Sequence, residues 1–290
     1  MSRHVARDIT YAHSAETRPG RAVIRVMENA TGRLRLIKRA HGYDADVAQG
    51  RDFWQVMVER YGLSLDFIEG SLDQIPRDGP LIVVANHPYG ILDGLVLGHI
   101  LSRHRGDFRI LAHQVFRKAE DLNRVILPVD FAETREAMKV NLETRNAARS
   151  FLADGGAIGI FPGGTVSTAQ KPFGTPLDPG WRRFTARLIA KSNATVVPIC
   201  FHGHNSRSFQ VASHLHTTLR MALLIREFGK RTDKPVSLSV GQPILPSEWG
   251  EYAKDAKSMM DFLRDRTYAL SKTPGAQGAY GFEFEDKHKA

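Results

Sequence analysis

Short apolar runs alternate along this chain with longer segments in which apolar residues recur every three or four positions. The short runs are rich in Ile, Val and Leu, as buried parallel strands are, and they predict strands at 81–86, 108–113, 125–131, 157–162, 194–201 and 236–242. The longer segments predict helices near 93–104, 133–153, 180–192, 214–230 and 254–271. This alternation predicts an α/β fold, with a largely parallel central sheet flanked by helices.

The domain organisation follows from length and composition. A chain of 290 residues, 42% of them hydrophobic, can bury one large core. We expect an N-terminal helical membrane-interface segment at 1–60, a main domain at 61–270 and a flexible tail at 271–290, where glycine and polar residues dominate.

The N-terminal segment carries part of the formal charge of +9, which implies an anionic partner. If 21–39 is helical, its apolar and basic residues separate onto opposite faces. The apolar face holds Val23, Met27, Ala30, Leu34 and Ile37, and the basic face holds Arg21, Arg25, Arg35 and Arg39. Such a helix can lie in an anionic membrane surface, which we favour over nucleic acid as the partner. A surface helix packed on its own domain explains the pattern equally well, and Gly32 weakens a continuous helix.

The compartment is expected to be the cytoplasmic face of the inner membrane, with the protein bound peripherally. No signal peptide is visible at the polar N-terminus. The longest apolar stretch, 81–101, contains Asn86, His87, Asp93 and His99, which are costly in hydrocarbon, so no transmembrane helix is expected. The single cysteine, Cys200, excludes an intrachain disulfide.

A histidine and an aspartate follow the predicted strand at 81–86, in Asn86-His87-Pro88-Tyr89-Gly90-Ile91-Leu92-Asp93. A neutral imidazole can take a proton from an alcohol when a carboxylate orients it. In a regular helix these two side chains would lie about 120° apart. Pro88 and Gly90 break helical geometry, so we expect a folded-back loop that brings Asp93 to His87.

A glycine-rich loop follows the predicted strand at 157–162. It runs Pro162-Gly163-Gly164-Thr165-Val166-Ser167-Thr168, and its backbone amides and hydroxyls are suited to binding an anion or a developing oxyanion. Taken alone, it is also typical of an ordinary strand-to-loop turn.

Together these two motifs resemble the glycerolipid acyltransferase family, whose signatures are Asn-His…Asp and Phe-Pro-Glu-Gly-Thr-Arg-Ser. Two later segments, 197–199 and 240–244, resemble its valine-proline and Gly-x-Pro-Ile blocks. The resemblance covers about 60 to 245 and implies an acyltransferase domain in 61–270. It implies that His87, held by Asp93, activates the hydroxyl of a lyso-lipid. That hydroxyl then attacks an acyl thioester, carried by coenzyme A or by an acyl carrier protein.

The departures from the family pattern bear on the acceptor. Five residues separate His87 from Asp93 where the family usually has four, and Gly163 and Val166 replace its usual Glu and Arg. Where many members end the second block in another arginine, this chain reads Leu127-Pro128-Val129-Asp130-Phe131. Loss of both arginines weakens a phosphate-binding site, since a dianionic phosphate needs charged partners. The chain thus looks more like the branch that acylates bacterial lyso-aminolipids, such as lyso-ornithine lipid.

The expected substrate-binding residues are those beside the two motifs and two lysines that can meet a phosphate: Asn86, Pro162, Gly163, Gly164, Thr165, Ser167, Lys118 and Lys171. No cofactor is expected. No metal is expected either, because His202 and His204 have no third ligand at meaningful spacing. Three alternatives stay open. They are a 1-acylglycerol-3-phosphate acyltransferase that uses Lys118 or Lys171, a non-catalytic membrane-associated lipid-binding protein, and a thioesterase.

Overall fold

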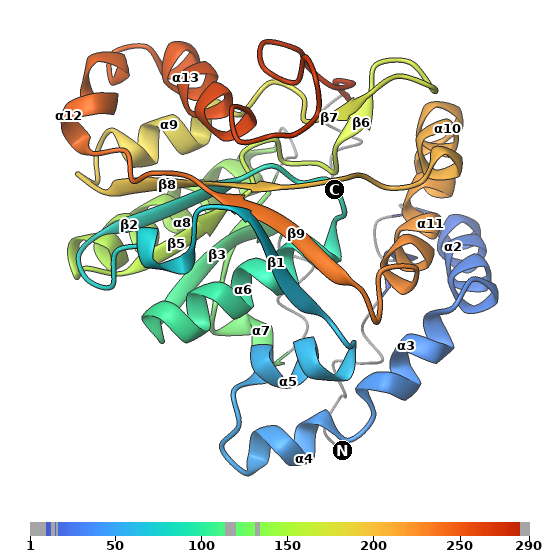
Figure 1. Ribbon diagram of the computed structural model, residues 1–290. Coiled ribbons are helices and arrows are strands. Elements are labelled where there is room, and N and C mark those ends of the chain that lie inside the picture. The colour runs from blue at the N-terminus through green and yellow to red at the C-terminus, as the bar shows by residue number, and fades with distance from the viewer. Residues whose placement is uncertain (1–9, 13–14, 16, 114–119, 131–133, 285–290) are drawn as a thin grey trace.

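The computed structural model describes residues 10–12, 15, 17–113, 120–130 and 134–284 (Figure 1). Within this part of the chain, a seven-stranded sheet has the order β1-β9-β8-β2-β5-β3-β4. Its strands are β1 (Ser64–Glu69), β2 (Leu81–Ala85), β3 (Phe108–His113), β4 (Ile126–Val129), β5 (Ala157–Ile160), β8 (Thr195–Phe201) and β9 (Pro235–Val240). Neighbouring strands are parallel except β8 and β9, so the predicted largely parallel sheet is confirmed.

Helices cover both faces of the sheet. They are α2 (Arg18–Ala30), α3 (Arg33–Ala40), α4 (Tyr43–Ala48), α5 (Phe53–Arg60), α6 (Ile91–Arg105), α7 (Glu120–Asn123), α8 (Arg135–Ala153), α9 (Arg183–Ile189), α10 (Arg207–Leu215), α11 (Thr217–Gly229), α12 (Pro246–Trp249) and α13 (Ala256–Tyr268). Short 3-10 turns η2 (Leu72–Gln74) and η4 (Gly250–Tyr252) and a small hairpin, β6 (Thr168–Ala169) with β7 (Pro176–Leu177), complete the described elements.

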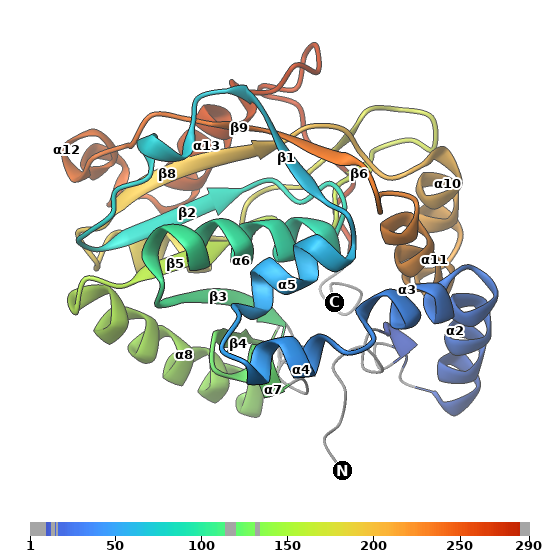
Figure 2. The ribbon, with the colours of Figure 1, turned by 60° about the horizontal axis from the view of Figure 1, so that its bottom comes forward.

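The central strand β2 divides the core into two layers because successive side chains of a strand point to opposite faces. Leu81, Val83 and Ala85 pack with α5 and α6 on one face, where Figure 2 shows both helices crossing the sheet. Ile82 and Val84 pack with residues of α8, α9 and α13 on the other. All five residues of β2 are buried, which explains its unbroken apolar sequence.

The N-terminal segment differs from the predicted single helix. Thr31 and Gly32 separate α2 from α3, and Gly32 has a φ of 121°, a conformation that favours glycine. Helix α5 buries Phe53, Trp54 and Met57 in the same core as the sheet. The predicted boundary at residue 60 therefore cuts through one continuous core.

Other elements were not predicted, among them strand β1, helix α10 and the short elements α7, α12, β6 and β7. Strand β1 lies at the sheet edge and is largely exposed, so its sequence lacks an apolar run. The tail predicted at 271–290 packs on the domain in its described part. Gly281 N donates to Asp178 O at 2.8 Å, Phe282 N donates to Thr168 O at 2.9 Å, and Phe284 is buried.

Candidate active site

His87 and Asp93 form a close pair where β2 ends. Nδ1 of His87 lies 3.0 Å from Oδ2 of Asp93, whose side chain is fully buried. The loop folds back as the sequence predicts, and Asp93 sits in the first turn of α6. Because Nδ1 faces the carboxylate, Nε2 is the ring nitrogen available to a substrate, the arrangement that a general base requires.

The Pro88–Gly90 loop also holds the carboxylate. Oδ2 of Asp93 accepts hydrogen bonds from the backbone amides of Tyr89 (2.8 Å) and Gly90 (3.0 Å). Gly90 has a φ of 88°, and a Cβ there would lie 3.3 Å from Val166. Burial raises the pKa of the Asp93 carboxyl, while His87 and the two amides oppose that rise. The same groups that fix Asp93 in place therefore favour its ionised form.

His87 is also held by the residue that follows β5 and by a buried aspartate. Its ring stacks on Phe161, with centroids 4.2 Å apart. The backbone amide of His87 donates to Oδ1 of Asp178 at 3.1 Å, and its carbonyl accepts from Ser167 N at 2.8 Å. Asp178 also accepts from the Ser167 hydroxyl and from the Trp181 indole (3.0 Å). Asp178 thus joins the two sequence motifs into one unit.

A buried arginine fixes the glycine-rich loop from behind. Arg220 of α11 donates to the Thr165 hydroxyl (3.1 Å), the Val166 carbonyl (2.7 Å) and the Thr168 hydroxyl (2.6 Å). Burial lowers the pKa of Arg220 to about 9, which leaves it charged at neutral pH. The loop hydroxyls therefore serve largely to hold the loop, and Gly164, with a φ of 65°, makes its turn.

An apolar cavity of about 240 Å³ opens beside this unit. His87 lines it together with Pro162, Gly164 and Thr165 of the loop. Most of the remaining wall is apolar and comes from both sides of the sheet and from α5, α6 and α11, including Phe53, Trp54, Met57, Leu95, Ile110, Leu111, Ile126, Ile160, Phe161, Leu224 and Phe228. Among the described lining residues, Arg182 carries the permanent positive charge. The His87–Asp93 pair therefore adjoins a chamber that is suited to a hydrocarbon chain and has one cationic lining residue.

The other predicted binding residues occupy different places. The Asn86 amide donates to Phe201 O (2.9 Å) and accepts from Phe201 N (2.7 Å), which fastens β2 to β8. Gly163 and Ser167 adjoin Asp178 and are not among the described cavity-lining residues. Lys171 is exposed between β6 and β7, also outside that lining. Lys118 lies outside the described residues.

The predicted membrane-interface residues divide into outward and inward groups. Arg21, Leu34 and Arg35 are exposed and Arg25 is partly buried, but Met27 and Ile37 pack against the core. Arg39 forms an ion pair with Asp233. The large apolar side chains that α2 and α3 expose are Val23 and Leu34, which belong to the predicted apolar face, and Val26, which does not.

Sequence reasoning missed three residues that build this site: Tyr11, Asp178 and Arg220. Each lies far in sequence from His87, and Asp178 and Arg220 have no apolar or glycine pattern that marks them. Tyr11 lines the cavity, and its backbone amide donates to Glu28 of α2 at 2.6 Å. Only the tertiary structure brings these groups to the pair.

Comparison with known proteins adds to this geometry. The model of the family described as Acyltransferase matches residues 68–202, which include the pair and the glycine-rich loop. The chain is similar to this family over the segment that holds the candidate active site. Together with the relatives described below, this similarity supports an acyltransferase enzyme, as the motifs predict.

Two named proteins and one solved structure are similar to this acyltransferase. It is 27% identical over 224 residues to the lyso-glycine lipid O-acyltransferase of Phocaeicola vulgatus, covering 71% of this chain and 76% of that protein. It is 26% identical over 222 residues to the protein of the same name from Bacteroides thetaiotaomicron, covering 71% and 78%. The crystal structure of the 1-acyl-sn-glycerophosphate acyltransferase of Thermotoga maritima matches 85% of this chain and 98% of that one at 18% identity, with a TM-score of 0.44.

Proposed function

We propose that this acyltransferase transfers a fatty acyl group from a thioester to the hydroxyl of a lyso-lipid, with His87 as general base. The observation that carries the proposal is the His87–Asp93 pair at 3.0 Å on the wall of an apolar cavity. Nε2 takes the hydroxyl proton as that oxygen attacks the thioester carbonyl. The carbon–sulfur bond then breaks, and the departing thiolate receives the proton from the imidazolium. Asp93 stabilises the imidazolium, and the cavity holds the hydrocarbon chain.

The favoured acceptor is a bacterial lyso-aminolipid. The two relatives named lyso-glycine lipid O-acyltransferases support this choice. An acyl-amino acid lipid of this class carries a free carboxylate, which needs a cationic partner when it leaves water. We assign this task to Arg182, which lines the cavity with His87 and whose backbone is fixed beside the loop by the hydrogen bond from its amide to Pro162 O at 2.9 Å.

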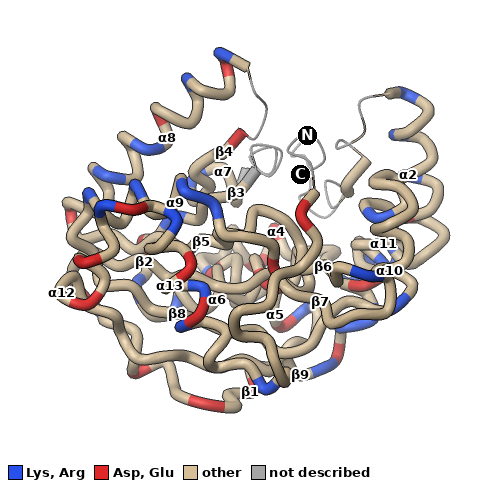
Figure 3. The backbone as a smooth tube through the Cα atoms, turned by 90° about the horizontal axis from the view of Figure 1, so that it is seen from above, with Lys and Arg blue, Asp and Glu red and all other residues tan. Residues whose placement is uncertain are grey.

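We also place the enzyme on an anionic membrane surface through α2 and α3. Val23, Val26 and Leu34 expose 47%, 67% and 60% of their surface among several arginines. A water-exposed patch of this composition is typical of an interfacial helix. Figure 3 shows α2 standing at one flank of the molecule and α8 at the other. Among the described residues, no helix has both the length and the apolarity to cross a bilayer.

The acceptor is tested by pairing a substitution with a change in the lipid. Purified protein receives a long-chain acyl thioester with a lyso-aminolipid, its carboxyl methyl ester, or lysophosphatidic acid. The wild type is expected to make diacyl product from the free carboxylate with a KM roughly 10-fold or more below that for the methyl ester, given the strength of a charged hydrogen bond.

Arg182→Gln is expected to lose this preference, because the variant lacks the cation that meets the free carboxylate and the methyl ester has no charge to meet. Arg182→Lys, which keeps a cation, should retain part of it. Preference for lysophosphatidic acid would assign the enzyme to phospholipid synthesis instead. An unchanged preference in Arg182→Gln would remove this residue from acceptor recognition.

A further inference from the structure

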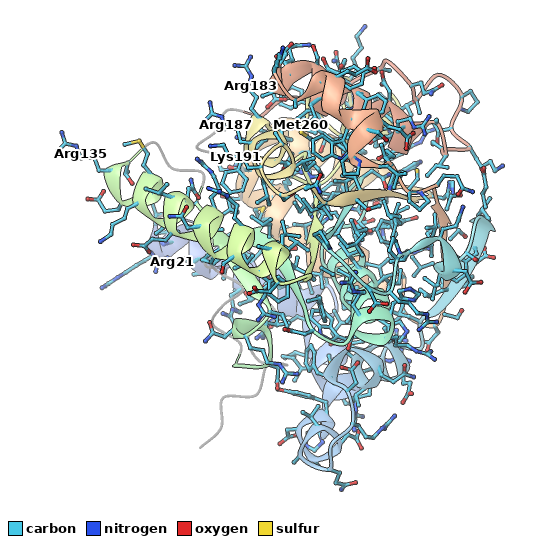
Figure 4. The ribbon with its side chains drawn as sticks, turned by 90° about the vertical axis from the view of Figure 1, so that its left-hand side faces the viewer. Arg21, Arg135, Arg183, Arg187, Lys191 and Met260 are labelled. Atoms are coloured by element: carbon cyan, nitrogen blue, oxygen red, sulfur yellow. The ribbon has the colours of Figure 1, made fainter. Side chains whose placement is uncertain are left out.

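A group of cations, exposed except for one that is partly buried, covers the outer side of α8 and α9. We call Arg145, Arg149, Arg183, Arg187 and Lys191 the basic face. Arg183 and Arg187 are one helical turn apart on α9, Lys191 follows that helix directly, and Figure 4 shows all three side chains leaving the same side of the molecule. Arg145 of α8 joins the two helices, since its guanidinium lies 5.2 Å from the centre of the Phe184 ring. Arg149 lies one turn further along α8.

The protein itself neutralises little of this charge. Within the described part of the chain, none of the five cations lies within 4.0 Å of a carboxylate oxygen. Asp255 is near Arg183: its pKa is lowered chiefly by the Ser258 hydroxyl and to a smaller extent by Arg183. Like charges held side by side without partners repel one another, so the face gains most from an anionic surface.

The basic face adjoins the active-site cavity. Arg182, Phe184 and Thr185, which begin α9, line that cavity on its inner side. Arg183 and Arg187 project outward from the same helix. A partner bound at the basic face, with a thioester on a flexible prosthetic arm, is thus separated from His87 by one helix.

The composition of the face distinguishes a protein partner from a bilayer. The large exposed apolar residues of α2 and α3 are Val23, Val26 and Leu34, and α8 exposes Met138 and Leu142 in its first two turns. Helix α9, the part of the basic face beside the cavity, has no large exposed apolar residue. A surface that inserts into lipid needs such side chains, but one that receives an acidic protein needs only cations and fit. The row from Arg183 to Lys191 is about 12 Å long, which matches a helical surface better than a single phosphate.

We propose that the basic face docks an acidic acyl carrier protein, which delivers the acyl thioester to His87 from the side opposite the membrane-facing helices. This proposal rests on the proposed acyl transfer and names the partner in it. Attraction between the two surfaces raises the association rate and steers the prosthetic arm toward the cavity.

The test compares two charge reversals of equal size. Arg183→Glu with Arg187→Glu alters the basic face, and Arg77→Glu with Arg124→Glu alters two exposed arginines that precede β2 and β4, at the other end of the parallel strands. Each enzyme is assayed with palmitoyl acyl carrier protein and with palmitoyl coenzyme A. Binding of the unacylated holo-carrier, which involves no turnover, is measured by fluorescence anisotropy.

We expect the basic-face variant to raise KM for the acyl carrier protein by roughly 10-fold or more, with kcat nearly unchanged, and to weaken carrier binding equally. The control variant and the coenzyme A reaction should change less than about 2-fold. Two outcomes would overturn the docking proposal, each with coenzyme A turnover intact. They are equal losses in both variants, and a wild type that does not bind the carrier. Loss of vesicle binding in the basic-face variant, with carrier binding unchanged, would assign the face to the membrane. Failure of the proposed function has a different signature, namely no acyl transfer from either donor.

Discussion

The wall around His87 and the outer surface of α2 and α3 use their polar groups in opposite ways. At the wall, Asp93, Asp178 and Arg220 are buried and bonded to backbone or side-chain partners. On α2 and α3, cations and apolar side chains such as Val26 and Leu34 face water. The difference teaches that the first region fixes geometry, while the second offers contacts that only an external surface can complete. Substitutions should therefore separate turnover from membrane access.

The largest effect on turnover is expected from substitution of His87 in the cavity wall. His87→Ala removes the group that accepts the hydroxyl proton, so kcat should fall by roughly 10²–10⁴. Stability should change little, because His87 is partly exposed and its backbone contacts with Asp178 and Ser167 remain. Rates on detergent-dispersed lyso-lipid and thermal unfolding measure the two properties. Near wild-type turnover in the folded variant would remove His87 from the chemistry.

The next effect concerns the exposed surface. Val26→Ser with Leu34→Ser removes two apolar side chains from the proposed membrane contact, so partition onto anionic vesicles should weaken by roughly 10-fold. Turnover on detergent-dispersed substrate should stay within about 2-fold, because neither residue lines the cavity. Met138→Ser with Leu142→Ser on α8 is the matched control, since both of those residues are also exposed. If the two double variants behave alike, α2 and α3 hold no special place at the membrane.

The smallest expected effect links the two regions. Glu28, fully buried on α2, accepts from the Thr10 hydroxyl and from Tyr11 N, both at 2.6 Å, and so positions the Tyr11 that lines the cavity. Burial raises the pKa of Glu28 above its ordinary 4.5, against the opposing effect of these hydrogen bonds. The contribution of Glu28 to folding stability is therefore complete below pH 4.5. It is lost as the pH rises through the raised pKa that Glu28 has in the folded state.

Glu28→Gln should remove this pH dependence. Over the window that begins at 4.5, the wild-type melting temperature should fall by a few degrees relative to that of the variant. Parallel melting curves for the two proteins across this window would contradict the assignment. Glu59, which is exposed, supplies the control through Glu59→Gln.

The sequence predicted those parts of the molecule that have local patterns. Strand β2 was predicted because all five of its residues are buried and therefore apolar. The folded-back loop was predicted because Pro88 and Gly90 exclude a helix. The edge strand β1 was not, since its exposed sequence has no apolar run. Asp178 and Arg220 were also missed, because their importance comes from partners that only the fold brings close.

The central claim is direct transfer from thioester to lyso-lipid, with His87 as base and no acyl-enzyme. It is tested by mixing enzyme with a long-chain acyl thioester in a stopped-flow instrument, first without acceptor and then with lyso-aminolipid, while recording thiol release and intact-protein mass. The account predicts unmodified protein and no thiol burst until the acceptor is added, after which thiol and diacyl lipid appear in equal amounts. A stoichiometric burst without acceptor, together with a protein mass increased by one acyl group, would contradict it.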